Sequence, residues 1–233
     1  MILFPKYFMK IIFKSAPIFS VIVLLGCSNP ADKVPEAKVA APNAASEPAA
    51  PAPEAAARSF VINPDNSTIN FIGSKVTGSH NGGFKKFIGE LHVANGKLAD
   101  AGNKIVIETA SLYADNPRLT GLLKSRDFFN VAEIPTATFE TTAISSNTTN
   151  STVTGNLTLH GVTKQISFPA SITVSEATVG VVAQFFINRF DFDIKYPGKA
   201  NDLIRKEVVL KLKVNATPGS VDFQSVEKLT GAL

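Results

Sequence analysis

The sequence contains few of the residues from which disulfides and metal sites are built. Its 233 residues include one cysteine, three histidines and no tryptophan. A single cysteine excludes an internal disulfide. No two of the histidines, His80, His92 and His160, have the spacing of a zinc site. We therefore predict no metal centre and no cofactor.

Sequence motifs of catalysis are also lacking. There is no nucleophile elbow, and the glycine-rich stretch "GSHNGG" has neither Walker nor dinucleotide-binding spacing. A Ser-His-Asp triad assembled from distant positions stays open, but the scattered carboxylates favour a protein that is not an enzyme. His80, in the predicted glycine-rich loop, is the best histidine for a functional role. We interpret His92 as a solvated strand residue and His160 as a turn residue hydrogen-bonded to the backbone.

The excess of positive charge belongs mostly to the N-terminus. The chain has 23 basic and 19 acidic side chains, and residues 1–26 hold three of the lysines and no acid. The rest of the chain is therefore nearly neutral, with 20 against 19. Without a clustered basic face, we predict no nucleic-acid partner.

The N-terminus has the pattern of a secretion signal. Three lysines precede an apolar run, Ala16–Gly26, that is too short to span a bilayer comfortably. The run ends in "LLGC", which resembles the lipobox of bacterial lipoproteins, where cleavage precedes the cysteine and its thiol carries diacylglycerol. We predict a signal peptide at 1–26 and lipidation of Cys27. The alternatives are a secreted protein with an unpaired thiol and an uncleaved membrane anchor. Ser28, in place of a retaining aspartate, favours the periplasmic side of the outer membrane.

Residues 27–58 are rich in alanine, proline and glutamate. Beyond Pro30 their only large aliphatic residues are Val34 and Val39, too few to offset the entropy of ordering. We predict a disordered spacer. Fully extended as polyproline II, the 31 residues 28–58 would reach about 90 Å and hold the domain away from the membrane.

Residues 59–217 alternate with the period of β-strands and are followed by a tail at 218–233. The alternation is clear at 153–159, 166–174 and 208–214. One stretch, 117–128, has helical spacing of its leucines and a proline near its start. Consecutive strands with short polar turns predict an antiparallel sandwich or barrel. We favour an all-β, eight-stranded barrel, because closure removes exposed strand edges.

Phenylalanine is abundant, with 17 residues. In the segment 185–192 both parities of the strand are apolar, so no wet face is predicted there. A packed core and a ligand-binding cavity would use the same rings, and periodicity does not distinguish them.

Several segments together resemble the YceI family of periplasmic lipocalin-like proteins. They are "GGFKKFIGEL", "GLLKSRDFFNVAEIPTATFETT", "VTGNLTLHGVTKQISFP", "NRFDFDIKYP" and "LIRKEVVLKLKVNA". The chain departs from the family at Leu122, where a histidine is common, and Phe60 stands in for the aromatic residue that usually opens the domain. The resemblance implies an extended barrel whose lengthwise apolar pore holds a long isoprenoid, such as a quinone. It also implies that a helix at 119–129 caps the barrel, with Phe128 and Phe129 inward and Arg126 and Asp127 at the rim.

The predicted ligand-binding residues are the apolar side chains of these segments: Phe84, Phe87, Leu119, Leu122, Leu123, Phe128, Phe129, Phe139, Phe185 and Phe190. Two functions remain open, besides a purely structural packed barrel. The protein either stores or carries an isoprenoid lipid in the cell envelope, or hands a bound quinone to a membrane cytochrome. The oligomeric state also stays open, with a dimer as one alternative.

Overall fold

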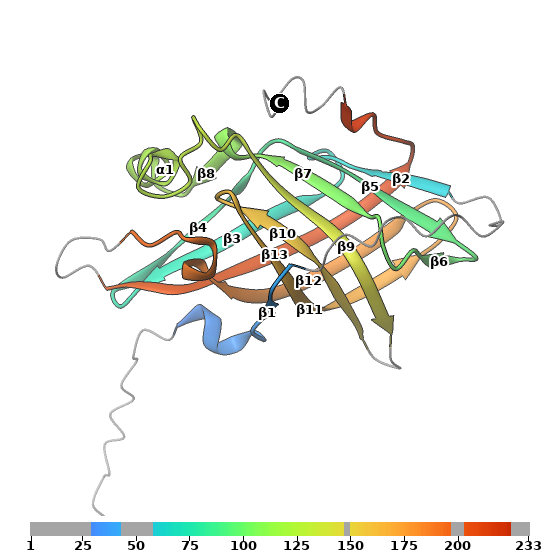
Figure 1. Ribbon diagram of the computed structural model, residues 1–233, viewed down its shortest axis with the longest axis horizontal. Coiled ribbons are helices and arrows are strands. Elements are labelled where there is room, and N and C mark those ends of the chain that lie inside the picture. Colours follow the sequence, from blue (N-terminus) through green and yellow to red (C-terminus); the bar gives the residue numbers. More distant parts are fainter. Residues whose placement is uncertain (1–28, 43–57, 147–149, 197–202, 225–233) are drawn as a thin grey trace, which may run out of the picture.

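A computed structural model describes residues 29–42, 58–146, 150–196 and 203–224 (Figure 1). The predicted signal peptide and Cys27 lie outside the described residues. The strands are β1 (Lys38–Ala40), β2 (Arg58–Ile62), β3 (Thr68–Lys75), β4 (Gly78–Phe84), β5 (Phe87–Ala94), β6 (Lys97–Leu98), β7 (Lys104–Glu108), β8 (Leu112–Ala114), β9 (Thr136–Ser146), β10 (Ser151–Leu159), β11 (Val162–Val174), β12 (Val179–Asn188) and β13 (Ile204–Pro218). The helices are the 3₁₀ turns η1 (Pro30–Lys33), η2 (Thr109–Ser111) and η3 (Arg189–Phe192), and the α-helix α1 (Pro117–Lys124).

Eight of these strands close a barrel. The ring runs β2–β5–β7–β9–β10–β11–β12–β13 and returns to β2 through the pairs Thr217–Val61 and Pro218–Phe60. Every pairing in the ring is antiparallel, which confirms the predicted fold class. Strands β3, β4 and β8 extend the wall from β13 toward one end, where α1 lies (Figure 1).

The wall also opens along one seam, and the N-terminal segment fills it. Strand β11 pairs with β12 only over 171–174. The backbone groups of β11 before residue 171, and those on the facing edge of β12 at Phe186, are therefore left for other partners. Strand β1 pairs antiparallel with 165–167 of β11. Just before β1, the Phe186 N–H donates to Pro35 O, and the Ala37 N–H donates to Phe186 O. The segment therefore joins two diverging strands of the barrel wall.

This docking corrects the expectation that residues 27–58 form a spacer without contacts. Within the described part, 29–42, Ala31 and Ala37 are only 3% and 2% exposed. Helix η1 packs against β13, and the Asn29 side chain caps η1 and accepts from the Ser74 hydroxyl. Backbone pairing to open strand edges and two small buried side chains hold the segment in place. A count of large aliphatic residues in the sequence does not predict these interactions.

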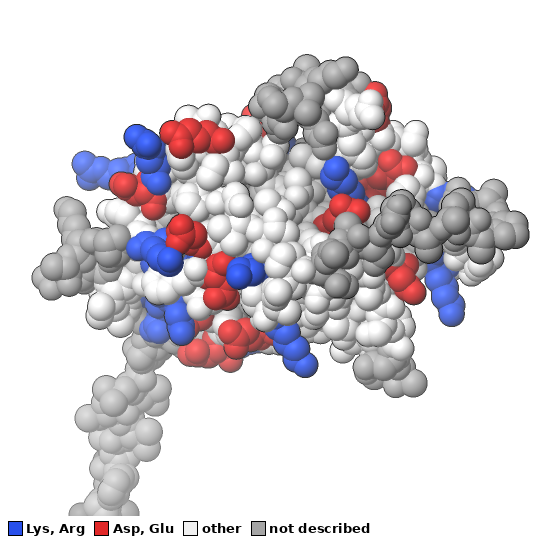
Figure 2. Space-filling view, in the orientation of Figure 1, with Lys and Arg blue, Asp and Glu red and all other residues white. Residues whose placement is uncertain are grey.

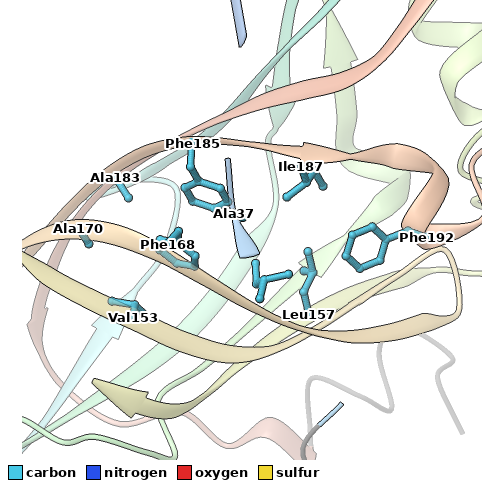
Figure 3. Close-up of a cluster of buried hydrophobic side chains, with 10 residues drawn as sticks. Ala37, Val153, Leu157, Phe168, Ala170, Ala183, Phe185, Ile187 and Phe192 are labelled. Carbon is cyan, nitrogen blue, oxygen red and sulfur yellow. The ribbon is translucent and has the colours of Figure 1, made fainter. Parts of the chain in front are cut away.

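The interior follows the predicted alternation. Ile166, Phe168 and Ala170 of β11 are buried together with Val153 and other inward residues of neighbouring strands. Figure 3 shows this cluster, with Ala37 reaching it from the N-terminal segment. A second cluster, around Phe60 and Ile62, fills the part of the barrel near β2 and β5.

Helix α1 is shorter than predicted. Its N-cap is Asn116, whose side chain accepts from the backbone N–H groups of Arg118 and Leu119, and it ends at Lys124. Ser125 is the C-cap, and its hydroxyl bonds back to Leu122 O, which ends the helix before Phe128. Among the described helices, none has the length and apolar character needed to cross a membrane.

Candidate functional site

The barrel encloses an apolar cavity of about 370 Å³. Protein interiors are packed closely enough that voids much larger than a water molecule are few, so a cavity of this size is a feature of the fold. Among the described residues, seven phenylalanines line it: Phe71, Phe84, Phe128, Phe129, Phe139, Phe168 and Phe185. Aliphatic side chains from β3, β7, β10, β12, β13 and α1 complete the wall.

Neighbouring rings fix one another in the cavity wall. Phe168 stacks on Phe185 with centroids 4.1 Å apart, and Phe139 lies 5.7 Å from Phe168. Near α1, Phe84 meets Phe129 edge to face at 6.2 Å. Such pairs hold large apolar surface in place with few rotatable bonds, so the cavity is formed before any ligand enters.

Eight of the ten predicted ligand-binding residues line this cavity: Phe84, Leu119, Leu122, Leu123, Phe128, Phe129, Phe139 and Phe185. The other two do not. Phe87 is buried in the second core cluster, beside Phe60. Phe190 is 43% exposed, because it has the opposite parity to Phe185 and Ile187, which line the cavity. The turn η3 then buries Phe192. Phe190 was predicted to bind the ligand, but the structure places it on the surface, outside the cavity lining.

The segment after α1 closes one end of the cavity. Phe128 is buried and its ring lies 4.7 Å from that of Tyr196, while Phe129 contacts Phe84. Arg126 and Asp127 are exposed, and Arg126 forms a surface ion pair with Glu133. Leu122, at the position where the family often has histidine, contributes an apolar side chain to the lining.

Arg189 holds this closed end together. It is 5% exposed, and its guanidinium donates to the backbone oxygens of Arg205, Ile194 and Tyr196. It also lies 6.0 Å from the Phe128 ring centroid and 4.7 Å from that of Phe190. Burial lowers the pKa of Arg189, but an arginine remains protonated at neutral pH.

The chain matches the family model described as YceI-like domain over residues 60–216. It belongs to the YceI-like family.

Sequence relatives and solved structures agree with this assignment. A UPF0312 protein of Pseudomonas putida strain W619 is 31% identical over 134 residues, covering 54% of this chain and 70% of the relative. A UPF0312 protein of Pseudomonas aeruginosa strain LESB58 is 42% identical over 69 residues; the match spans 30% of this chain and 36% of that protein, about a third of its length.

Among solved structures, Burkholderia cenocepacia BcnA superposes with a TM-score of 0.59 at 24% identity, covering 65% of this chain and 96% of BcnA. A polyisoprenoid binding domain from Saccharophagus degradans gives 0.55 at 16% identity, covering 70% and 100%. At these identities the likeness concerns the fold, and it agrees with the predicted lipocalin-like barrel.

The histidines of this YceI-like domain lie in different surroundings. His80 is on strand β4 and not in a loop as predicted; it borders the cavity, with Nδ1 2.8 Å from Oδ1 of Asp115. His92 is a partly exposed residue of β5 beside the Ser59 hydroxyl. His160 is in the β10–β11 turn, where it and Gly161 have φ of 51° and 75°. Its Nδ1 has no hydrogen-bond partner within the described residues, contrary to the expected backbone bond.

The carboxylate of Asp115 is held in its charged form. It accepts from the Asn81 backbone N–H at 2.8 Å and lies beside His80. The backbone hydrogen bond first, and the His80 contact second, lower the pKa of Asp115 from its ordinary value. This pair fixes β8, and with it the start of α1, to β4.

The YceI-like domain uses several cavity residues that the sequence predictions omitted. Arg189, Tyr196 and Arg205 line the capped end, and Phe71 and Phe168 line the wall. Arginine inside the apolar run "FFINRFDF" was a usable signal, because an isolated charge in a buried segment needs specific acceptors.

Surface charge gives no further site on the visible face. Figure 2 shows basic and acidic residues interspersed on it. Within the described ranges, no group of three or more His, Cys, Asp or Glu side chains is arranged to hold a metal ion.

Proposed function

We propose that the cavity binds a long-chain isoprenoid lipid, an isoprenoid quinone or a polyprenyl compound, and stores or carries it in the cell envelope. The observation that carries the proposal is the preformed apolar cavity of about 370 Å³ inside the barrel. Ligand pockets have this order of volume and are mostly apolar. The alternative of a fully packed barrel leaves such a void unexplained.

The energetics favour an extended hydrocarbon ligand. Each methylene group transferred from water into the cavity contributes about 0.8 kcal/mol, and the rings that receive it are already fixed. The structural neighbour from Saccharophagus degradans is named a polyisoprenoid binding domain, which supports an isoprenoid as the hydrocarbon.

An envelope location is the second part of the proposal. It rests on the leader at 1–26 and on the "LLGC" sequence that ends at Cys27. In this proposal the lipidated Cys27 anchors the protein to a membrane, where its ligand is also found.

The test is lipid extraction from the full-length protein after expression in a bacterium and purification, followed by mass spectrometry. We expect a stoichiometric isoprenoid lipid. Recovery of a quinone would direct further work to the redox alternative, in which the protein passes the quinone to a membrane cytochrome. Protein that carries no lipid, and takes none up from vesicles, would contradict the proposal.

A pair of variants on one strand makes the test specific to the cavity. Ala137 of β9 is buried and lines the cavity, whereas Ala143 of the same strand is exposed. Ala137→Phe should fill part of the void and reduce bound lipid several-fold. Ala143→Phe adds the same side chain outside and should retain lipid at the wild-type level.

A further inference from the structure

The cavity is apolar along its length except at one end. There Ser74, Lys75, His80, Arg189, Tyr196 and Arg205 join the lining. The register pairs Lys75 with Ile204, and Arg189 donates to Arg205 O. These residues therefore gather where β3 ends and β13 begins, beside the cap formed by the segment after α1.

Most of the polar groups at this end already have partners. Arg189 donates to three carbonyls, His80 faces Asp115, and Ser74 donates to Asn29. Lys75 is engaged as well. Each of them therefore already has at least one partner within the protein.

Arg205 differs from these neighbours. Its Nε is buried and has no hydrogen-bond partner in the described part of the chain. A buried donor without an acceptor costs about 1–3 kcal/mol, and more when it is charged. Proteins tolerate such a group mainly where something else supplies the acceptor.

Charge at this end points the same way. None of the ion pairs between described residues involves Arg189 or Arg205. Two guanidinium groups thus border an apolar cavity without a carboxylate from the described residues to balance them. An incoming group with oxygen acceptors meets a favourable field, and the Arg205 side chain that borders the cavity has a donor without a partner among the described residues.

We infer that this end of the cavity is a headgroup site, in which the Arg205 guanidinium donates a hydrogen bond to an acceptor oxygen of the bound lipid. The inference rests on the proposed function, since it assigns a polar head to the same ligand. Two lipids offer this chemistry: a prenyl phosphate, whose oxygens are anionic, and a prenyl quinone, whose carbonyl oxygens are neutral. A plain hydrocarbon offers none.

The test compares three probes that share a four-isoprene chain: a prenyl phosphate, a prenyl quinone and the hydrocarbon without a headgroup. Affinities are measured on lipid-free full-length protein in its wild-type, Arg205→Met and Arg118→Met forms. Arg118 is an exposed residue of α1 outside the cavity lining, so its replacement controls for loss of a positive charge near the cap.

We expect Arg205→Met to weaken the probe with the natural headgroup chemistry about 10- to 100-fold, the factor for a hydrogen bond to a charged group. The hydrocarbon should change less than twofold, and Arg118→Met should change none of the three. A loss confined to the phosphate probe would identify an anionic head, and a loss for the quinone a carbonyl head.

Two further readouts separate a headgroup role from a structural one. Arg205 Nε has no hydrogen-bond partner among the described residues. Arg205→Met should therefore leave the melting temperature of the lipid-free protein unchanged or raise it. Arg205→Lys keeps the charge and should recover part of the affinity for the phosphate. Equal weakening of all three probes, or a lowered melting temperature with no headgroup discrimination, would overturn the inference while leaving lipid binding intact. Failure of wild-type protein to bind any probe would refute the proposed function itself.

Discussion

At the scale of single residues, Arg189 joins the cap to two other segments, the start of β13 and the loop at 194–196. Its donors reach the start of β13 and the loop at 194–196, and its guanidinium lies near the ring of Phe128. Buried charges are tolerated when every donor finds an acceptor. Each of the three nitrogens of Arg189 donates to a backbone carbonyl, so its role can be separated from that of Arg205.

We predict that Arg189→Met lowers the free energy of unfolding by about 2–3 kcal/mol, because three carbonyls lose a charged donor in a buried site. Urea denaturation measures the change. Arg118→Met, on the surface of α1, should stay within about 0.5 kcal/mol of wild type. An equally small effect at Arg189 would mean that water replaces its hydrogen bonds.

Asp115 gives a pH dependence whose sign follows from its lowered pKa. The folded protein holds this carboxyl below its ordinary pKa of 3.8, so the folded state binds its proton less readily than the unfolded state. The stabilisation is complete above the ordinary pKa and is lost as the pH falls through the folded-state pKa. Asp115→Asn should flatten the acid limb of a melting-temperature profile below about pH 4. An unchanged acid limb would contradict the prediction.

Residue positions were predictable where a strand stays regular. Alternation placed Ile166, Phe168 and Ala170 inside, and they are buried. It fails at Phe192, which has the same parity as Phe186 and Phe190 but is fully buried. There the strand gives way to a 3₁₀ turn at Arg189, in which the Asn188 side chain accepts from the Phe190 N–H. The unpaired donor of Arg205 depends on tertiary contacts and left no trace in the local pattern.

At the scale of elements, β1 is the part of the fold that composition concealed. Its three residues are too few to predict a strand, and it gains its partners because β11 and β12 diverge. A signal did exist on the neighbouring strands β12 and β13. Phe186 and Val209, paired across β12 and β13, are apolar at positions outside the barrel, and Val209 is 1% exposed. Apolar residues on both faces of a strand indicate a second covering layer.

We predict that Ala37→Asp undocks the N-terminal segment, because it places a carboxylate where the native side chain is 2% exposed. Hydrogen exchange should show lost protection at the Phe186 amide, which donates to Pro35 O. The barrel ring itself should keep its protection, since its eight strands pair without β1.

Ala40→Asp is the matched control. It makes the same replacement three residues later, at an exposed position of β1, and should leave the Phe186 amide protected. Loss of protection across the whole barrel in Ala37→Asp would show that the segment is needed for closure and not only docked on it.

At the scale of the whole molecule, the docked segment changes the expected relation between barrel and membrane. A free spacer of 31 residues would let the domain stand as far as about 90 Å from the anchor. Asn29, however, bonds to Ser74 at the polar end of the cavity. Only two residue steps, from 27 to 29, then separate a Cys27 anchor from the barrel, a reach of about 7 Å. If Cys27 is lipidated as proposed, the polar end of the cavity is held close to the bilayer, where a lipid ligand would enter and leave.

This geometry is testable by fluorescence quenching from the bilayer. The chain has one cysteine, so a lipidated Cys27 leaves an introduced cysteine as the only reactive thiol. Thr77→Cys labels the exposed turn between β3 and β4, next to the polar end, and Ala177→Cys labels the exposed turn between β11 and β12 at the opposite end of the barrel (Figure 1). On vesicles with a quencher in the headgroup layer, the label at 77 should be quenched more strongly than the label at 177. Adding Ala37→Asp should release the barrel onto the full length of its tether and make the two labels equal, whereas adding Ala40→Asp should preserve the difference. Equal quenching of both labels in the otherwise wild-type protein would mean that docking of residues 29–42 does not orient the barrel, and that ligand exchange is not confined to the end nearest the anchor.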